Sequence, residues 1–206
     1  MQGFEARNSA NMLVLLGDND YTQSAASFRA NWRASFGWAR RTGLRVAGVL
    51  GNHDWWKDGP KVRRALESAG VVVLDNHAQA VTLGQCRLWL VGVGDLWEGH
   101  PDIPLAFAAV NDDAPVIAIT HNPDLFPQMP ARASLVVAGH THGGQVWLLP
   151  GRPSKRGLHY LAGKFDQDGR HLFVTPGIGT SIMPFRFRVP PEISRLTLHA
   201  ARQASP

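Results

Sequence analysis

The residues best suited to chemistry follow four short apolar runs of the sequence. The runs end in Gly17-Asp18, Gly51-Asn52-His53-Asp54, His121-Asn122 and Gly139-His140-Thr141-His142. If each run is a strand of an α/β sheet, the polar residues collect beyond the carboxyl ends of the strands, where such sheets bind ligands. The sequence therefore predicts one site at this edge.

The side chains gathered there are typical metal ligands. Imidazole nitrogens mixed with carboxylate and amide oxygens, without thiolates, suit Mn²⁺, Fe, Zn²⁺ or Co²⁺. A carboxylate such as Asp18 can bridge two ions about 3.5–4 Å apart, and such a pair polarises a phosphoryl oxygen and holds a hydroxide for in-line attack. A histidine that binds no metal can protonate the leaving oxygen. Glycines at 17, 51 and 139 would let the backbone turn sharply and approach an ion.

The elements that must position these residues alternate between strand and helix in the first half of the chain. Apolar periodicity predicts a helix from Thr22 to Thr42, one that starts at Pro60 and ends at Gly70, and a short one at Pro101–Val110. Strands are expected at Met12–Leu16, Arg45–Leu50, Val71–Leu74, in two runs between Ala78 and Val93, and at Pro115–Thr120, Ser134–Ala138, Gln145–Leu149, Leu172–Thr175 and Ile193–His199. The pattern favours an α/β fold, with a mixed sheet or two sheets packed face to face. No repeat or linker divides residues 1–206, so a single domain is expected.

Composition further limits the classes of substrate, partner and location that the protein can have. The net charge is +5 and the pI about 10.0, which suits an anionic substrate, but the basic residues are scattered and predict no dedicated nucleic-acid patch. One cysteine, Cys86, excludes a disulfide framework or a thiolate cluster within the chain. No run of about 18 apolar residues predicts a transmembrane helix. Met1–Glu5 does not resemble a signal peptide, so the sequence as it stands predicts a cytoplasmic protein.

The motifs resemble the calcineurin-like metallophosphoesterase superfamily. The strings GNHDWW (Gly51–Trp56), HNPD (His121–Asp124), GHTHGGQ (Gly139–Gln145) and PFRFRVPPE (Pro184–Glu192) are similar to its bacterial branch of small phosphodiesterase-like hydrolases. The resemblance implies two mixed β-sheets packed face to face and flanked by helices.

The resemblance also implies roles for the site residues. Asp18 would bridge two divalent metal ions. Asn52, His121 and His140 would complete one metal sphere, and His142 would belong to the other. His53 would contact the phosphate or act as general acid, and Asp54 would orient the His53 imidazole.

The family pattern opens with a strand that ends in Asp-x-His, and none of the sixteen residues before Gly17 is a histidine. Relative to the family, the chain is therefore expected to be N-terminally incomplete, with the first strand missing. Three explanations stay open: a truncation, a variant that binds only one metal tightly, and a degenerate non-catalytic relative. A truncation would leave an exposed sheet edge that favours a homodimer. A lost segment could also have carried a membrane anchor or export signal.

The sequence thus predicts a metal-dependent phosphoester hydrolase, with phosphodiesters favoured over monoesters as substrates. A nuclease or nucleotide phosphodiesterase is the alternative enzyme. A single-metal or non-catalytic relative that acts as a scaffold or sensor is the alternative from another class. Trp55-Trp56 either line a substrate groove or pack in the core, Asp95 and Trp97 overhang the site, and Arg186 either clamps a phosphate or serves the structure.

Overall fold

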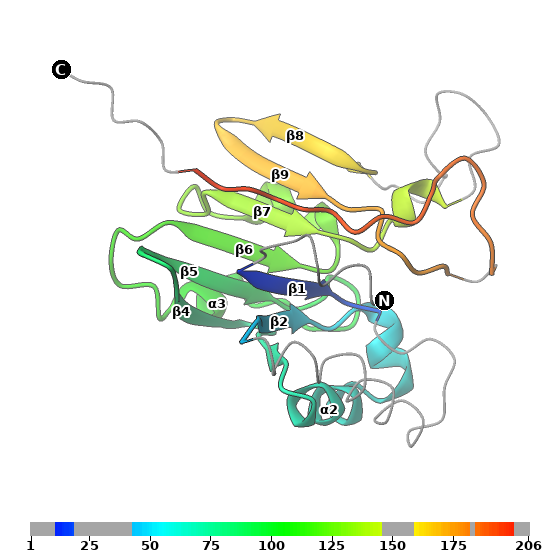
Figure 1. Ribbon diagram of the computed structural model, residues 1–206, viewed down its shortest axis with the longest axis horizontal. Helices are drawn as coiled ribbons and strands as arrows, with labels where there is room; N and C mark the ends of the chain where they lie inside the picture. Colours follow the sequence, from blue (N-terminus) through cyan, green and yellow to red (C-terminus); the bar gives the residue numbers. More distant parts are fainter. Residues whose placement is uncertain (1–10, 19–42, 146–158, 182–183, 200–206) are drawn as a thin grey trace.

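The computed structural model describes residues 11–18, 43–145, 159–181 and 184–199 (Figure 1). Within them the elements run in the order β1 (Met12–Leu16), β2 (Arg45–Val49), α2 (Asn52–Ser68), β3 (Val72–Val73), β4 (His77–Leu83), β5 (Cys86–Val93), α3 (Ile103–Phe107), β6 (Val116–Thr120), the 3₁₀ helix η1 (Pro123–Gln128), β7 (Leu135–Ala138), the 3₁₀ helix η2 (His142–Gly144), β8 (Gly163–Gln167) and β9 (Arg170–Val174). The helix expected from Thr22 to Thr42 and most of the strand expected at Gln145–Leu149 lie outside the described residues.

The smaller sheet has three parallel strands in the order β1-β2-β3. Four of the five residues of β2 are buried, as expected for a strand covered on both faces. The first residues after β1 and β2, Gly17 and Leu50, bring the chain to the same end of this sheet.

The larger sheet has six strands in the order β4-β5-β6-β7-β9-β8. Its four central strands are parallel, and antiparallel hairpins close both edges, so the sheet is mixed. Strands β6 and β7 lie side by side, with Thr120 paired to Ala138, and both lead directly into candidate site residues.

Three apolar layers hold the two sheets and their helices together. Ala47, Val49, Leu90, Ile119 and Val137 pack between the sheets. Helix α2 covers the outer face of the small sheet, and α3 and η1 cover the outer face of the large one. The predicted architecture, two sheets face to face with flanking helices, is confirmed, and Figure 1 shows β1 and β2 lying over the larger sheet.

Two predicted elements differ from the structure. Helix α2 has two segments that meet at Asp58, whose backbone is non-helical, and the second segment contains the helix expected from Pro60. The first segment was not predicted; it begins at Asn52 because Gly51 takes the extended N-cap conformation and the Asp54 carboxylate accepts the Gly51 N–H. The strand expected at Ile193–His199 is not formed. This segment is extended, but Ile193 and Leu198 are more than half exposed and no strand pairs with it among the described residues. Strand β8 was not predicted, since its sequence GKFDQ is largely polar.

Candidate metal centre

The candidate residues follow strands of both sheets. Asp18 lies after β1, the Gly51–Asp54 segment after β2, His121 after β6 and His140 after β7. The four strands belong to two sheets, two in each, instead of to one continuous edge. The centre therefore lies where the carboxyl ends of the two packed sheets meet.

Two glycines permit this close approach. A Cβ atom at Gly17, which has φ +91°, would lie 2.4 Å from His121 Nδ1, and one at Gly51 would lie 2.3 Å from Asp18 Oδ1. Atoms cannot approach so closely, so any larger residue would displace His121 or Asp18. Gly17 and Gly51 are thus required by the contact between the segments that follow β1, β2 and β6, whereas a Cβ atom at Gly139 would lie 3.3 Å from its nearest neighbour, in Leu16.

Asp18, His121 and His140 form a compact ligand cluster. Each offers one ligand atom, and these atoms all lie within 4.8 Å of one another. His121 Nε2 lies 3.4 Å from Asp18 Oδ2, 3.1 Å from Asn52 Oδ1 and 2.9 Å from His140 Nδ1. The structure therefore brings together four of the five residues predicted to bind metal.

The protonation of His121 makes this cluster suitable for a cation. Its Nδ1 contacts the carbonyl oxygen of Leu16, which can only accept, so Nδ1 must carry a proton. In the neutral ring Nε2 then presents a lone pair that faces the oxygens of Asp18 and Asn52 and a nitrogen of His140. A proton on Nε2 can serve one of these acceptors at a time, whereas a divalent ion accepts all of them as ligands. The residues present thus fit a metal ion.

The charges at the centre agree with this arrangement. Burial lowers the pKa of His121, but hydrogen bonding to Asp18 and the charge of that carboxylate outweigh burial and raise it to about 9. Burial raises the pKa of Asp18, but hydrogen bonding to His121 and the charges of His121 and His53 lower it to about 2. Burial and the charge of His121 lower the pKa of His140 to about 3. At neutral pH Asp18 is ionised and His140 neutral, as ligands must be, whereas His121 carries a proton on Nε2 that a bound metal ion would displace.

His142, the fifth predicted ligand, lies apart from this cluster. Its Nδ1 lies 3.2 Å from the carbonyl oxygen of Gly179, and burial holds its pKa below the usual value. His142 shares one backbone feature with His140 and Asp18: all three have φ between +51° and +66°. Left-handed conformations are uncommon for such residues and concentrate at functional sites.

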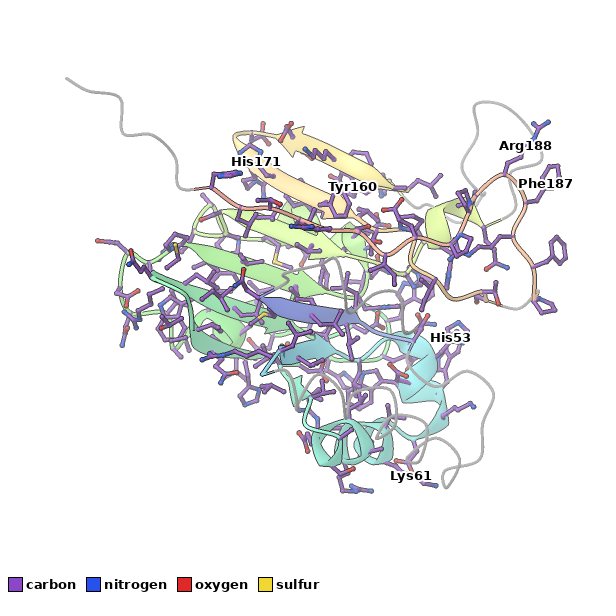
Figure 2. The ribbon with its side chains drawn as sticks, viewed as in Figure 1. His53, Lys61, Tyr160, His171, Phe187 and Arg188 are labelled. Atoms are coloured by element: carbon purple, nitrogen blue, oxygen red, sulfur yellow. The ribbon has the colours of Figure 1, made fainter. Side chains whose placement is uncertain are left out.

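His53 and Asp54 stand at the first turn of α2. The backbone N–H of His53 donates to Asp18 Oδ1 at 3.0 Å, and its ring Nε2 lies 4.0 Å from Asp18 Oδ2 and 3.2 Å from Ser181 Oγ. Figure 2 shows His53 at the start of this helix, beside the end of β1. Asp54 is fully buried and its Oδ2 accepts the Gly51 N–H at 2.9 Å. Orientation of the His53 ring by Asp54 stays a prediction.

Two further residues belong to the site, and the sequence indicated their importance only weakly. Ser181, at the end of the Gly177–Ser181 loop, contacts the His53 ring. Gln145, the last residue of the GHTHGGQ string, holds this loop: its Oε1 accepts the Ser181 N–H and its Nε2 donates to the Ser181 and Phe185 carbonyls. Neither residue type predicts such a role by itself.

Arg186 serves the structure and is occupied by backbone contacts. Its guanidinium donates to the carbonyl oxygens of Pro176, Gly179 and His142. It thus fixes the loop that contacts the His142 ring. Arg188 lies over the ring of Phe187 at 5.3 Å, and Figure 2 shows both side chains directed outward from the C-terminal segment.

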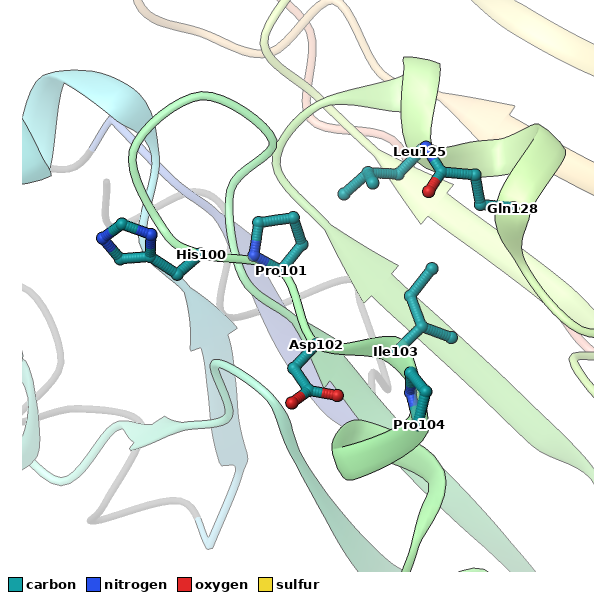
Figure 3. Close-up of a pocket in the computed structure, with 7 residues that line it drawn as sticks. All are labelled: His100, Pro101, Asp102, Ile103, Pro104, Leu125 and Gln128. Carbon is teal, nitrogen blue, oxygen red and sulfur yellow. The ribbon is translucent and has the colours of Figure 1, made fainter.

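A surface pocket lies elsewhere, beside α3 and η1. Figure 3 shows its lining of His100, Pro101, Asp102, Ile103, Pro104, Leu125 and Gln128. No candidate ligand lines it, and the Asp102 carboxylate is engaged in capping α3 through the Leu105 N–H. The candidate metal ligands lie instead at the strand ends.

The fold is that of a metallophosphoesterase. The sequence model for calcineurin-like phosphoesterases matches residues 1–144, and the chain belongs to that family. It is 36% identical over 156 residues to phosphodiesterase YaeI of Escherichia coli, an alignment that covers 72% of this chain and 56% of the relative. The family predicted from the motifs is confirmed.

Two other similarities agree with the family. The chain is 31% identical over 156 residues to the uncharacterized metallophosphoesterase YkuE of Bacillus subtilis, covering 73% of this chain and 54% of YkuE. The structure resembles NAD nucleotidase of Haemophilus influenzae with a TM-score of 0.54 and 13% identity, over 85% of this chain and 42% of that one. The chain spans about half the length of the curated relatives that it matches. Among the described residues, no helix is long and apolar enough to cross a membrane.

Proposed function

We propose that this protein is a metal-dependent hydrolase of phosphate esters that prefers diesters to monoesters. The observation that carries the proposal is the convergence of Asp18, Asn52, His121 and His140 on one point, with acceptor atoms facing one another at 2.9–3.4 Å. Family membership and the 36% identity to a phosphodiesterase support the reaction class. The net charge of +5 suits an anionic substrate.

The ligands have different roles in this proposal. Asn52, His121 and His140 would hold one divalent ion together with Asp18, and Asp18 and His142 would hold a second. When bound, the ions supply Lewis-acid polarisation of the phosphoryl oxygens and lower the pKa of a water molecule. Leu16 keeps His121 in the tautomer that exposes Nε2, and the His53 backbone N–H fixes one oxygen of Asp18.

His53 is the group that donates a proton to the leaving oxygen. Its ring lies at the edge of the ligand cluster, 4.0 Å from Asp18 Oδ2, and its Nε2 is 3.2 Å from Ser181 Oγ. The Ser181 hydroxyl can accept a hydrogen bond from this nitrogen or donate one to it, so it holds the ring in either protonation state. This arrangement orients the imidazole without requiring it to bind a metal ion.

Leaving groups of different basicity test the role of His53. With Mn²⁺ present, His53→Ala should retain much of its activity on bis-p-nitrophenyl phosphate, because p-nitrophenolate leaves without help. It should lose about 100-fold or more on diphenyl phosphate, whose leaving group is more basic. His171→Ala is the matched control, since His171 is exposed and paired with Asp166 far from the site. Equal losses on both esters would contradict a proton-donor role.

A protein that binds one metal ion without catalysis is the second candidate. The compact cluster favours it, because among the described residues the ligand atoms surround one point and His142 stands apart. The two candidates differ in turnover: a binding protein would retain one ion per chain and hydrolyse neither ester at any concentration of Mn²⁺.

A further inference from the structure

Two exposed tryptophans contact the two sides of the candidate centre. The ring of Trp97 meets His140 edge to face, with centroids 4.6 Å apart and the planes at 90°. The ring of Trp56 meets His53 in the same manner, at 4.6 Å and 71°. Trp56 is 57% exposed and Trp97 is 46% exposed, so each presents a large aromatic surface to solvent beside a functional histidine.

The neighbouring Trp55 is packed inward, unlike Trp56. The two interpretations of the Trp55-Trp56 pair, packing in the core or lining a substrate groove, therefore apply to different residues. Trp55 packs against the apolar cluster beneath α2, and a Cβ atom at Gly59 would strike its ring. Trp55 is therefore a core residue. Trp56 contributes nothing comparable to the core, and its exposed ring needs another explanation.

Hydrogen bonds hold the ring of Trp56 and the backbone of Trp97. Trp56 Nε1 donates to Glu98 Oε1 at 2.8 Å, which joins α2 to the loop that carries Trp97. That loop is fixed from below by Asp95, a fully buried carboxylate whose Oδ2 accepts the N–H groups of Trp97 and Glu98 at 2.9 and 3.0 Å. A fixed aromatic surface binds a planar ligand at little entropic cost.

We propose that Trp56 and Trp97 form an aryl subsite next to the phosphoryl centre, which binds a planar aromatic ester group that stays on the phosphorus when the other group leaves. The subsite rests on the proposed function, because its position beside His53 and His140 has meaning only if these residues act on a phosphate. It narrows the substrate class to phosphodiesters that carry an aromatic group close to the phosphorus. Aromatic faces stack favourably on tryptophan, and alkyl groups of equal length gain only from burial.

Two esters that release the same p-nitrophenolate test the subsite in catalysis. Bis-p-nitrophenyl phosphate carries a second aromatic ring, and methyl p-nitrophenyl phosphate carries a methyl group instead. Trp97→Ala and Trp56→Ala should each lower kcat/KM about tenfold for the first ester, as expected for loss of a stacking partner, and change it little for the second. Both esters react at the same centre, so a loss of metal lowers the two kcat/KM values equally. The ratio of kcat/KM for the first ester to kcat/KM for the second therefore does not respond to metal loss. Leu105→Ala, which removes an exposed side chain of α3, should leave the ratio unchanged.

Binding without turnover provides a second readout, which separates failure of the subsite from failure of the proposed function. Calorimetry on the Mn²⁺-loaded protein should show that phenylphosphonate binds more tightly than methylphosphonate and hexylphosphonate. Trp97→Ala should remove this preference and Trp97→Phe should keep it. If the protein binds phenylphosphonate preferentially but hydrolyses no ester, this result would support the subsite and contradict the proposed hydrolase function. Equal binding of the three phosphonates, or an unchanged ester ratio in both alanine variants, would overturn the subsite even in an active enzyme.

Discussion

On the inner side of the candidate centre, His121 and Asn52 are each 1% exposed, and the atoms that face one another are fixed by strands β1, β2 and β6. On the outer side, His142 is only half-buried, and its ring Nδ1 lies 3.2 Å from the carbonyl oxygen of Gly179. That carbonyl belongs to the Gly177–Ser181 loop, which is held by Gln145 and Arg186.

The difference shows how the fold distributes rigidity over the site. The inner ligands are positioned by backbone that is already fixed in the two sheets, so they need no metal to hold them. The outer ligand depends on side chains that brace a loop. We therefore expect the inner side to bind an ion tightly and the outer side to bind one weakly, and substitutions of the two sides should separate these affinities.

The largest effect is expected on the inner side. His140→Asn removes an imidazole that faces His121, and asparagine tolerates the left-handed backbone at this position. Affinity for the tightest Mn²⁺ ion, measured by equilibrium dialysis, should fall by more than about 100-fold, because loss of a direct ligand exceeds the 10–100-fold typical of its supporting partners. The fold should persist by circular dichroism. If the His140→Asn variant kept its full affinity for Mn²⁺, this would contradict the assignment of His140 as a metal ligand on the inner side.

A smaller effect is expected from crowding the inner side. Gly51→Ala places a Cβ atom 2.3 Å from Asp18 Oδ1. We expect a loss of about 1–3 kcal/mol in the free energy of unfolding, measured with urea, together with weaker metal binding. The matched control is Gly179→Ala, where the new atom would have 3.8 Å to its nearest neighbour. Equal stability of the two variants would argue against close contact between β1 and the Gly51 loop.

The same substitution on the outer side sharpens the comparison. His142→Asn should leave the tightest ion in place and lower kcat on bis-p-nitrophenyl phosphate by about tenfold at saturating Mn²⁺, since only a weak second ion loses a ligand. The Mn²⁺ concentration that gives half-maximal activity should rise. If His142→Asn instead removed the tight ion as completely as His140→Asn, the two sides would not differ.

The smallest effect concerns the support behind the inner side. Asp75 accepts the Leu50 N–H and pairs with Arg63 at 2.8 Å, yet burial dominates and raises its pKa from 3.8 to about 6. A raised carboxyl pKa stabilises the folded state at low pH, and this contribution is lost as the pH rises through about 6. Between about pH 5 and pH 7.5, Asp75→Asn should gain about 1 kcal/mol relative to the unsubstituted protein in urea unfolding. If the difference in unfolding free energy between Asp75→Asn and the unsubstituted protein were the same at both pH values, this would contradict the raised pKa of Asp75.

Much of the fold could be predicted because local pattern and tertiary structure agree. The apolar runs before Asp18, His121 and His140 form strands within a residue of the predicted bounds, since none of their residues is exposed and the runs are therefore almost uniformly apolar. Strand β8 was not predicted, and a strand was wrongly predicted at Ile193–His199. Whether either segment forms a strand depends on which partner strand is available.

The site could be predicted only in part. Residue type and strand-end position predicted that Asp18, His121 and His140 would lie together, because side chains that suit metal ions have a distinctive chemistry. The prediction that Trp97 overhangs the site agrees with its contact with His140. The contact of Ser181 with His53 was not predicted, since it joins segments far apart in the chain through a loop. The role of Asp54 was inferred from the family alone, and the structure adds its bond to the Gly51 backbone.

The most direct test is the metal content of the purified protein after incubation with Mn²⁺, determined by elemental analysis together with hydrolysis of bis-p-nitrophenyl phosphate. We predict at least one tightly held ion per chain and turnover that depends on it, both lost in Asn52→Ala, since Asn52 lies in the inner cluster and touches His121. A folded protein that retains no divalent ion, or an Asn52→Ala variant that binds and hydrolyses as well as the unsubstituted chain, would contradict the assignment of a metal centre to these strand ends.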